Sequence, residues 1–216
     1  MSYEASPLVA LAGPIEREGN VMRASPLRRS ALTIALVLGL GGQAWANSPT
    51  EQLRVYTDRV MEVLQSRTMT PPQRLEAVRA VASEAFDVSE TAQRALGPHW
   101  QQRTPAERQE FVQVFRSLLE QTYLSRIGEF GGERIKYVSE RIDGDRAIVR
   151  AVIVTKNGTE VPVESRLLQK ADRWLIYDVL IENISLIASY RSQFDRVIRT
   201  ASYPELIRRL KSHGSL

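Results

Sequence analysis

The stretch of sequence that decides the fold is residues 174–194, WLIYDVLIENISLIASYRSQF. Its first half alternates with a period of two, which is typical of a β-strand, and after Ile184-Ser185 it changes to the period of an amphipathic helix. We therefore expect a strand that continues into a helix. Asp178 lies in the middle of the otherwise apolar strand, and its carboxylate needs a partner because an unpaired buried charge is very costly.

Three further segments with a period of two precede this strand. The four strands are predicted at residues 134–142, 145–156, 159–170 and 174–181. The turns between them are Asp143-Gly144, Asn157-Gly158 and Ala171-Asp172. The first two are strong hairpin signals, because both central residues tolerate positive φ. The strands are therefore predicted to form an antiparallel meander.

Helical periodicity covers the segments on either side of the sheet. Helices are predicted at residues 50–65, 71–85, in a short stretch before Gly97-Pro98, at 105–128, at 185–200 and at 204–211. Thr104 and Glu107 form a capping box for the fourth helix, with Pro105 at its first position. Helices followed by a meander and then by helices predict an α+β fold.

The predicted turns determine which residues of neighbouring strands lie opposite one another. Two-residue turns would place Ser165 between Arg150 and Asp178. They would also place Tyr137 beside Arg150. We therefore expect a polar row on the buried face of the sheet, in which Asp178 faces Arg150 across Ser165. This row is either a satisfied ion pair that sets the register or a polar spot in an apolar cavity.

The composition limits the chemistry available to the chain. It contains no cysteine, which excludes disulfides, thiol catalysis and thiolate metal sites. The net charge is only +4 and the basic residues are scattered, so nucleic-acid binding is not expected. His99 and His213 have no metal-ligand spacing, and no glycine-rich phosphate loop is present. We expect no metal, no catalytic residue and no enzyme activity.

The first 46 residues have the pattern of a secretory signal. A segment that begins at Met22 has a basic region, an apolar run at residues 31–40 and an Ala-Trp-Ala cleavage site that ends at Ala46. The apolar run is too short to span a bilayer. We expect a start at Met22, cleavage after Ala46 and export of residues 47–216 to the periplasm as one domain. Its helical part would cover residues 50–128, and the sheet with the C-terminal helices would cover 133–211.

Several short motifs within residues 50–211 resemble the MlaC family, also called the toluene-tolerance family of periplasmic phospholipid-binding proteins. The matching residues are Gly97, Trp100, the run from Thr104 to Phe111, Trp174, Tyr177-Asp178, Ile184-Ser185, Tyr190-Arg191 and Phe194. One position departs from the family pattern, because Asn183 stands where the family usually has glycine. Asparagine tolerates the left-handed backbone that glycine would supply.

The resemblance implies a monomeric carrier in which helices and a curved, nuclear-transport-factor-like sheet of four strands enclose an apolar cavity. Phospholipid would be its cargo, and the protein would have no cofactor. Its partners would be an outer-membrane lipoprotein–porin complex and an inner-membrane ABC transporter with a substrate-binding ring. Hiding two acyl chains of about 30 methylenes from water is worth over ~20 kcal/mol, at about 0.8 kcal/mol each.

The residues expected to contact lipid are apolar or aromatic residues of the predicted inner faces. They are Phe111, Phe115, Leu118, Ile135, Tyr137, Val152, Val163, Ile176 and Leu180. The polar row of Arg150, Ser165 and Asp178 would instead hold the curvature of the sheet.

Two other functions are compatible with the same residues. An exported interaction module would have no ligand, and its apolar faces would all pack as core. A cavity enzyme would use Tyr137 and Asp178 as an acid–base pair, although a salt-bridged aspartate is a poor base. Shortening an inward side chain separates the carrier from the interaction module. A packed core would lose roughly a few kcal/mol of stability, whereas a lipid cavity would lose less and retain lipid differently.

Overall fold

A computed structural model describes residues 48–124 and 133–212. Its elements are α1 (Pro49–Gln65), α2 (Pro71–Ala85), α3 (Val88–Leu96), the 3-10 helix η1 (Gly97–Gln102), α4 (Pro105–Tyr123), β1 (Arg134–Asp143), β2 (Arg146–Val154), β3 (Glu160–Lys170), β4 (Arg173–Ile181), β5 (Ile184–Ser185), α5 (Leu186–Thr200) and α6 (Tyr203–Lys211). The predicted helices and the four long strands are confirmed. The predicted signal region and the end of the fourth helix at Gly128 lie outside the described residues.

Side-chain caps explain where the helices begin. Five helices follow a residue whose side chain accepts a hydrogen bond from the first turn, namely Ser48, Asp87, Thr104, Ser185 and Ser202. The predicted capping box is confirmed, because the Thr104 amide donates to Glu107 Oε2 at 2.8 Å and the Glu107 amide donates to Thr104 Oγ1 at 3.2 Å. Such caps satisfy amides that have no partner inside the helix.

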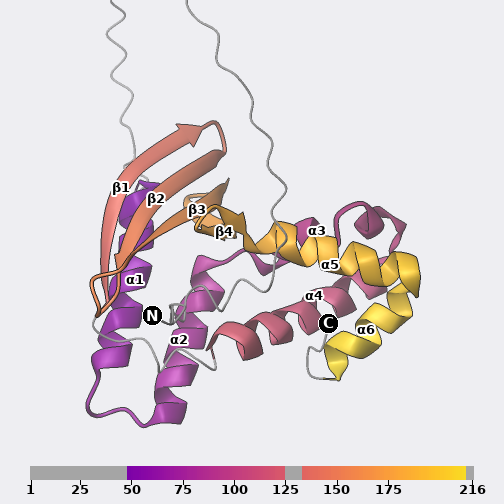
Figure 1. Cartoon of the computed structure of the whole chain (residues 1–216), viewed down its shortest axis with the longest axis horizontal. Coiled ribbons are helices and arrows are strands. Elements are labelled where there is room, and N and C mark those ends of the chain that lie inside the picture. Colours follow the sequence, from indigo (N-terminus) through magenta and orange to yellow (C-terminus); the bar gives the residue numbers. More distant parts are fainter. Residues whose placement is uncertain (1–47, 125–132, 213–216) are drawn as a thin grey trace, which may run out of the picture.

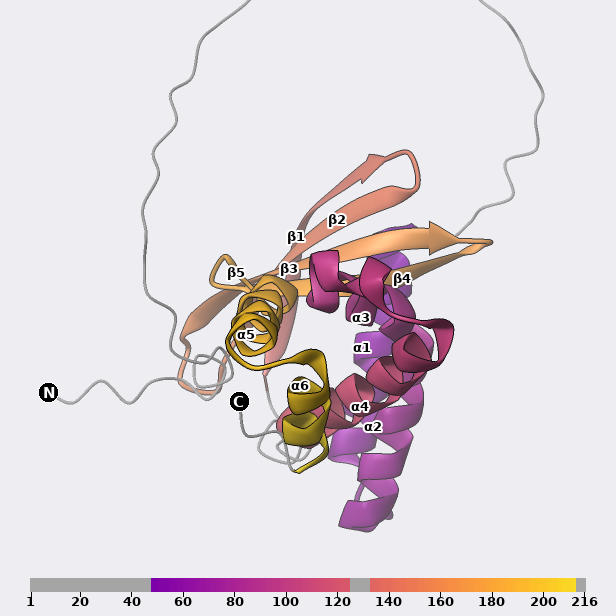
Figure 2. The same cartoon turned by 90° about the vertical axis from the view of Figure 1, so that its right-hand side faces the viewer.

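The strands form one antiparallel sheet in the order β1-β2-β3-β4-β5. The fifth strand was not predicted; it pairs with the end of β4 and leads directly into α5. Asn183, in the turn between β4 and β5, has a φ of 68°, which confirms the left-handed backbone expected there. Figure 1 shows β1 and β2 curving past α1, with α5 continuing from the other side of the sheet. In Figure 2 the sheet lies above the helices.

The predicted register between β2 and β3 is wrong by one residue. The backbone amide of Thr155 donates to the carbonyl of Thr159 at 2.9 Å, so the turn holds three residues rather than two. Arg150 therefore lies opposite Glu164 and not Ser165. A shift of one residue moves every side chain of a strand to the other face. The predicted face of β2, which included Val152, is consequently the opposite of the observed one.

The remaining differences in register come from a β-bulge in β4 and from the position of the turn between β1 and β2. In β4, Tyr177 is an extra residue, and beyond it Asp178 lies opposite Arg166 rather than Ser165. The turn between β1 and β2 is Gly144-Asp145 rather than the predicted Asp143-Gly144, because Asp143 lies opposite Arg146. Together with an irregularity between Tyr137 and Ser139, this turn places Tyr137 opposite Ala151. A bulge inserts one residue into one strand and re-aims the side chains that follow it. The predicted polar row of Tyr137, Arg150, Ser165 and Asp178 is therefore wrong.

The corrected register sorts the predicted sheet residues onto two faces. Ile135, Tyr137, Val163 and Ile176 share the face that packs toward α1 and α2, as predicted. Ser165 lies on this face as well, opposite Val149 and Val179. Val152 and Leu180 lie on the other face, where Leu180 is opposite Glu164.

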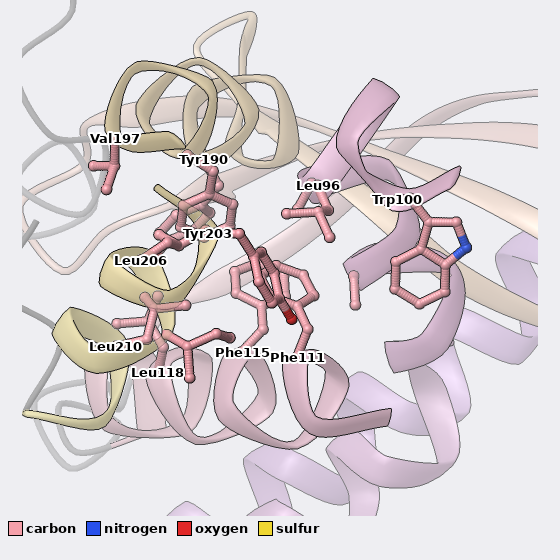
Figure 3. Packing of buried hydrophobic residues seen from close by; sticks show 14 of the residues in the cluster. Leu96, Trp100, Phe111, Phe115, Leu118, Tyr190, Val197, Tyr203, Leu206 and Leu210 are labelled. Atoms are coloured by element: carbon pink, nitrogen blue, oxygen red, sulfur yellow. The ribbon is translucent and has the colours of Figure 1, made fainter. Parts of the chain in front are cut away.

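The first apolar core, which we call the helical core, joins α3, η1, α4, α5 and α6. Its centre consists of four aromatic rings whose centroids are 5.2 to 5.7 Å apart, from Phe111, Phe115, Tyr190 and Phe194. Most of these pairs are edge-to-face, the arrangement that aromatic quadrupoles favour. Figure 3 shows Phe111, Phe115 and Leu118 pointing from α4 toward Tyr190 and the side chains of α6.

The second core joins α1 and α2 to the sheet. It consists of Leu53, Tyr56, Val81, Ala85, Ala147, Val149, Leu167, Trp174 and Ile176. The carbonyl of Ile176 accepts a hydrogen bond from the Asp87 amide at 2.9 Å, which ties the start of α3 to β4. In residues 48–124 and 133–212, no helix is long and apolar enough to cross a membrane.

Candidate functional site

An apolar cavity of about 230 Å³ lies where α2, α3, α4, β4 and α5 meet. Its wall is almost entirely apolar, and the residues that line it include Ala82, Phe86, Leu119, Tyr123, Val179 and Ile187. Phe86 is partly exposed at the end of α2. Sites for small ligands are typically concave and apolar, with a few polar groups that orient the ligand. The cavity therefore fits the apolar part of an amphipathic ligand.

Helix α4 contributes two different faces to the protein. Phe111, Phe115 and Leu118 are buried in the helical core. Leu119 and Tyr123, four residues apart and therefore neighbours on the helix, line the cavity, and both also pack against the edge of the helical core. The wide apolar face of α4 thus passes from fully buried core residues to partly buried residues that lie between the helical core and the cavity.

Asp178, in the middle of the apolar strand β4, has a hydrogen-bond partner for each of its carboxylate oxygens. Its Oδ2 accepts a hydrogen bond from Ser185 Oγ at 2.7 Å, and its Oδ1 accepts one from the backbone amide of Ile187 at 3.2 Å. Ser185 is also the N-cap of α5. A carboxylate is favourable at this end of a helix, because the unpaired amides and the helix dipole attract negative charge. Asp178 therefore fixes the start of α5, and with it the cavity residue Ile187.

Asp178 and Arg150 belong to one chain of ion pairs, although they do not face each other. Arg150 Nε lies 2.9 Å from Glu164 Oε2, and Arg166 Nε lies 3.1 Å from Glu164 Oε1. Arg166 Nη1 then lies 3.7 Å from Asp178 Oδ2. Glu164 and Arg166 take the bridging position that was predicted for Ser165. The chain links three strands on one face, which supports a structural role for these charges.

The polar side chains around the cavity are largely paired with one another. Arg79 Nε donates to Glu120 Oε2 at 2.9 Å, and the same guanidinium pairs with Glu76. Hydrogen bonds to Glu76 and then to Glu120 raise the pKa of Arg79, so it stays charged. Thr91 Oγ1 donates to the carbonyl of Asp87 at 2.7 Å. Arg116, on the exposed side of α4, also lines the cavity.

The structure does not bring together the residues of the alternative acid–base pair. The Tyr137 hydroxyl is 2.9 Å from Thr57 Oγ1 of α1, and burial raises the pKa of Tyr137. Asp178 shares no hydrogen-bond partner with it. Tyr123 and Tyr177 are the tyrosines that line the cavity, and burial raises the pKa of Tyr123 as well, so it stays neutral. Among the described residues, no group of three or more His, Asp or Glu could hold a metal ion.

None of the nine residues predicted to contact lipid lines this cavity. Those on α4 lie in the helical core, and those on the strands are divided between the two sheet faces. Reasoning from sequence missed Phe86, Leu119 and Ile187, because they lie at an element end or on the flank of an apolar stripe. Leu119 and Tyr123 carried a signal, since they belong with Phe111, Phe115 and Leu118 to the apolar residues whose period predicts the helix at residues 105–128.

Comparisons with known proteins agree with this architecture. Residues 54–212 match the sequence profile of the family described as MlaC protein. The intermembrane phospholipid transport system binding protein MlaC of Haemophilus influenzae is 22% identical over 128 residues, 56% of this chain. The match spans 59% of that relative's length.

A solved structure has the same fold. It is the phospholipid-binding protein from Ralstonia solanacearum in complex with a phospholipid, which is 24% identical to this chain with a TM-score of 0.67. The match covers 76% of this chain and 94% of the other. The family profile covers most of the chain and nearly all of the described residues, with helices and an antiparallel sheet arranged as in this structural relative. This chain therefore belongs to the MlaC protein family.

Proposed function

We propose that this protein is a periplasmic carrier that binds a phospholipid by its acyl chains and moves it between two membranes. The observation that carries the proposal is the apolar cavity between the helices and β4. It occurs in a chain whose fold is shared with a protein solved in complex with a phospholipid. The name of the Haemophilus influenzae relative, a binding protein of an intermembrane phospholipid transport system, supports the same function.

The size of the cavity has a consequence for loading. Two acyl chains contain about 30 methylenes, and we propose that the cavity of about 230 Å³ widens when it encloses them. The predicted contacts Tyr137 and Val163 lie on the sheet face toward the helices, along which a wider cavity would extend. We retain them as predicted contacts of the loaded form.

The proposal includes export and two membrane partners. Residues 1–46 would direct the chain to the periplasm and be removed. The partners would be an outer-membrane lipoprotein–porin complex and an inner-membrane ABC transporter with a substrate-binding ring. A carrier is physically necessary on such a route, because exposing the methylenes of two chains to water costs over ~20 kcal/mol. The protein would act as a monomer without a cofactor.

Solvent extraction followed by mass spectrometry tests the proposal. The protein is purified from the bacterial periplasm without detergent, and its extract is compared with that of an unrelated periplasmic protein treated identically. We expect phospholipid in near-stoichiometric amount in the first extract only. An empty protein that also takes no lipid from vesicles would contradict the proposal and favour an interaction module with a filled core.

A further inference from the structure

Arg116 differs from the other charged residues that line the cavity. Asp178 is held by Ser185, Ile187 and Arg166. Within residues 48–124 and 133–212, Arg116 makes no hydrogen bond or ion pair. It is exposed to solvent and also lines the cavity, so it lies at the edge of the apolar wall. The cavity thus has one unneutralised cation at its edge.

A neighbouring carboxylate could have neutralised Arg116 but does not. Glu120 is four residues after it on α4, a spacing at which oppositely charged side chains can pair. Its Oε2 accepts instead from Arg79 Nε of α2 at 2.9 Å. Arg79 pairs with Glu76 as well, so it is surrounded by two carboxylates. An anion at the edge of the cavity would therefore be attracted by Arg116 and not by Arg79.

The chemistry of the expected ligand matches this arrangement. A lipid whose acyl chains fill the cavity has its phosphate where the chains meet the solvent. A guanidinium binds a phosphate through two parallel N–H···O bonds, and it loses less hydration than an ammonium would. We propose that Arg116 binds the phosphate of the carried lipid, and that it makes the protein prefer phospholipids to neutral diacyl lipids. This inference rests on the proposed carrier function.

A comparison of two lipids with identical acyl chains tests the assignment. The full-length protein is expressed, purified and freed of lipid. Its affinity is then measured for a tail-labelled phosphatidylglycerol and for the matching tail-labelled diacylglycerol, which lacks the phosphate. We expect the wild type to prefer the phospholipid. Arg116→Gln should reduce that preference by about three- to tenfold, the range for a charge-assisted contact that is partly screened by solvent. Its affinity for diacylglycerol should not change.

Two further variants serve as controls for Arg116→Gln. Arg196→Gln removes an exposed arginine of α5 that does not line the cavity, and it should behave as the wild type. Arg116→Lys keeps the charge but loses the two-pronged geometry, so it should restore part of the preference. Circular dichroism of each variant confirms that the fold is retained.

The possible contrary results have different meanings. If Arg116→Gln keeps the wild-type preference, or weakens both lipids equally, the assignment of Arg116 is wrong while the carrier function stands. The assignment also fails if inorganic phosphate shifts the NMR signals of Arg116 in a protein that shows no lipid preference, because the residue would then serve a free anion. A wild type that binds neither lipid contradicts the carrier function and the assignment together.

Discussion

The helical core and the cavity are built on the same helix, and they differ in what completes them. On one face of α4, Phe111 and Phe115 are fully buried among the rings of Tyr190 and Phe194. On the adjacent face, Leu119 and Tyr123 are only partly buried; they pack against the edge of the same core and also line the cavity of about 230 Å³. The first face is completed by other side chains of the protein. The second, on our proposal, is completed by the acyl chains of a lipid.

Apolar residues of similar type can therefore contribute either to stability or to ligand binding, depending on their position around one helix. Rigid aromatic packing beside the cavity gives α4 and α5 fixed positions, while the cavity wall itself keeps room to accept a ligand. Substitutions in the packed core and at the cavity should therefore have different effects.

The largest effect is expected in the helical core. Phe115→Ala should lower the free energy of unfolding by about 3–5 kcal/mol, because it removes ring contacts and leaves a void that its rigid neighbours cannot fill. Denaturant unfolding monitored by circular dichroism measures this loss. A variant as stable as the wild type would show that Phe115 is not part of a packed core.

A smaller effect is expected where β4 supports the cavity. Asp178→Ala should cost about 1–3 kcal/mol, because Ser185 and the Ile187 amide lose a buried acceptor. Arg150→Ala, at the exposed end of the ion-pair chain, should cost less than about 1 kcal/mol. Urea titration of both variants measures the difference. Equal losses would indicate that the predicted direct pairing of Arg150 with Asp178 describes the protein better than the chain of ion pairs.

Filling the cavity should change stability little and binding strongly. Ala82→Trp places an indole in the cavity and should alter the free energy of unfolding by less than about 1 kcal/mol, since empty space accepts the added volume. The variant should carry much less phospholipid after detergent-free purification. Ala80→Trp, on the exposed side of the same helix, is the matched control and should keep its lipid. Normal lipid content in Ala82→Trp would place the lipid elsewhere.

The smallest effect concerns an exposed charge cluster on α6. Hydrogen bonds from Arg208 and Arg209 lower the pKa of Glu205 to about 2. A lowered pKa stabilises the fold above the unfolded value of about 4.3, and this contribution disappears as the pH falls through the folded value. The difference in unfolding free energy between wild type and Glu205→Gln should therefore narrow between about pH 5 and pH 2. If the difference in unfolding free energy instead widens as the pH falls, folding does not lower the pKa of Glu205.

The elements of the fold could be predicted from local signals. Apolar periods, the Thr104 capping box and the turn residues identified each helix and each long strand. Register could not be predicted in the same way, because it depends on bulges and on the exact length and position of each turn. In β4, residues of both faces are apolar, so the alternation around Tyr177 gives no sign that one residue is extra. One such residue separates the predicted partner of Asp178 from the observed one.

The site was harder to predict because the apolar face of α4 is wider than the core needs. Nothing in the sequence distinguishes Leu118, which packs in the helical core, from Leu119, which lines the cavity. That distinction depends on where α5 and β4 lie. Their placement follows from the hydrogen bonds of Asp178 to Ser185 and Ile187, contacts between residues that no pattern of periodicity relates.

The most direct test of the central claim is to map where a bound acyl chain lies. The protein is loaded with a phospholipid that carries a photoactivatable group near the end of one chain, and the cross-linked peptides are identified by mass spectrometry. We predict cross-links to residues of the cavity wall on α4, β4 and α5, including Leu119, Val179 and Ile187. Cross-links confined to the opposite face of the sheet, around Val152 and Leu180, would show that the acyl chain does not lie in this cavity.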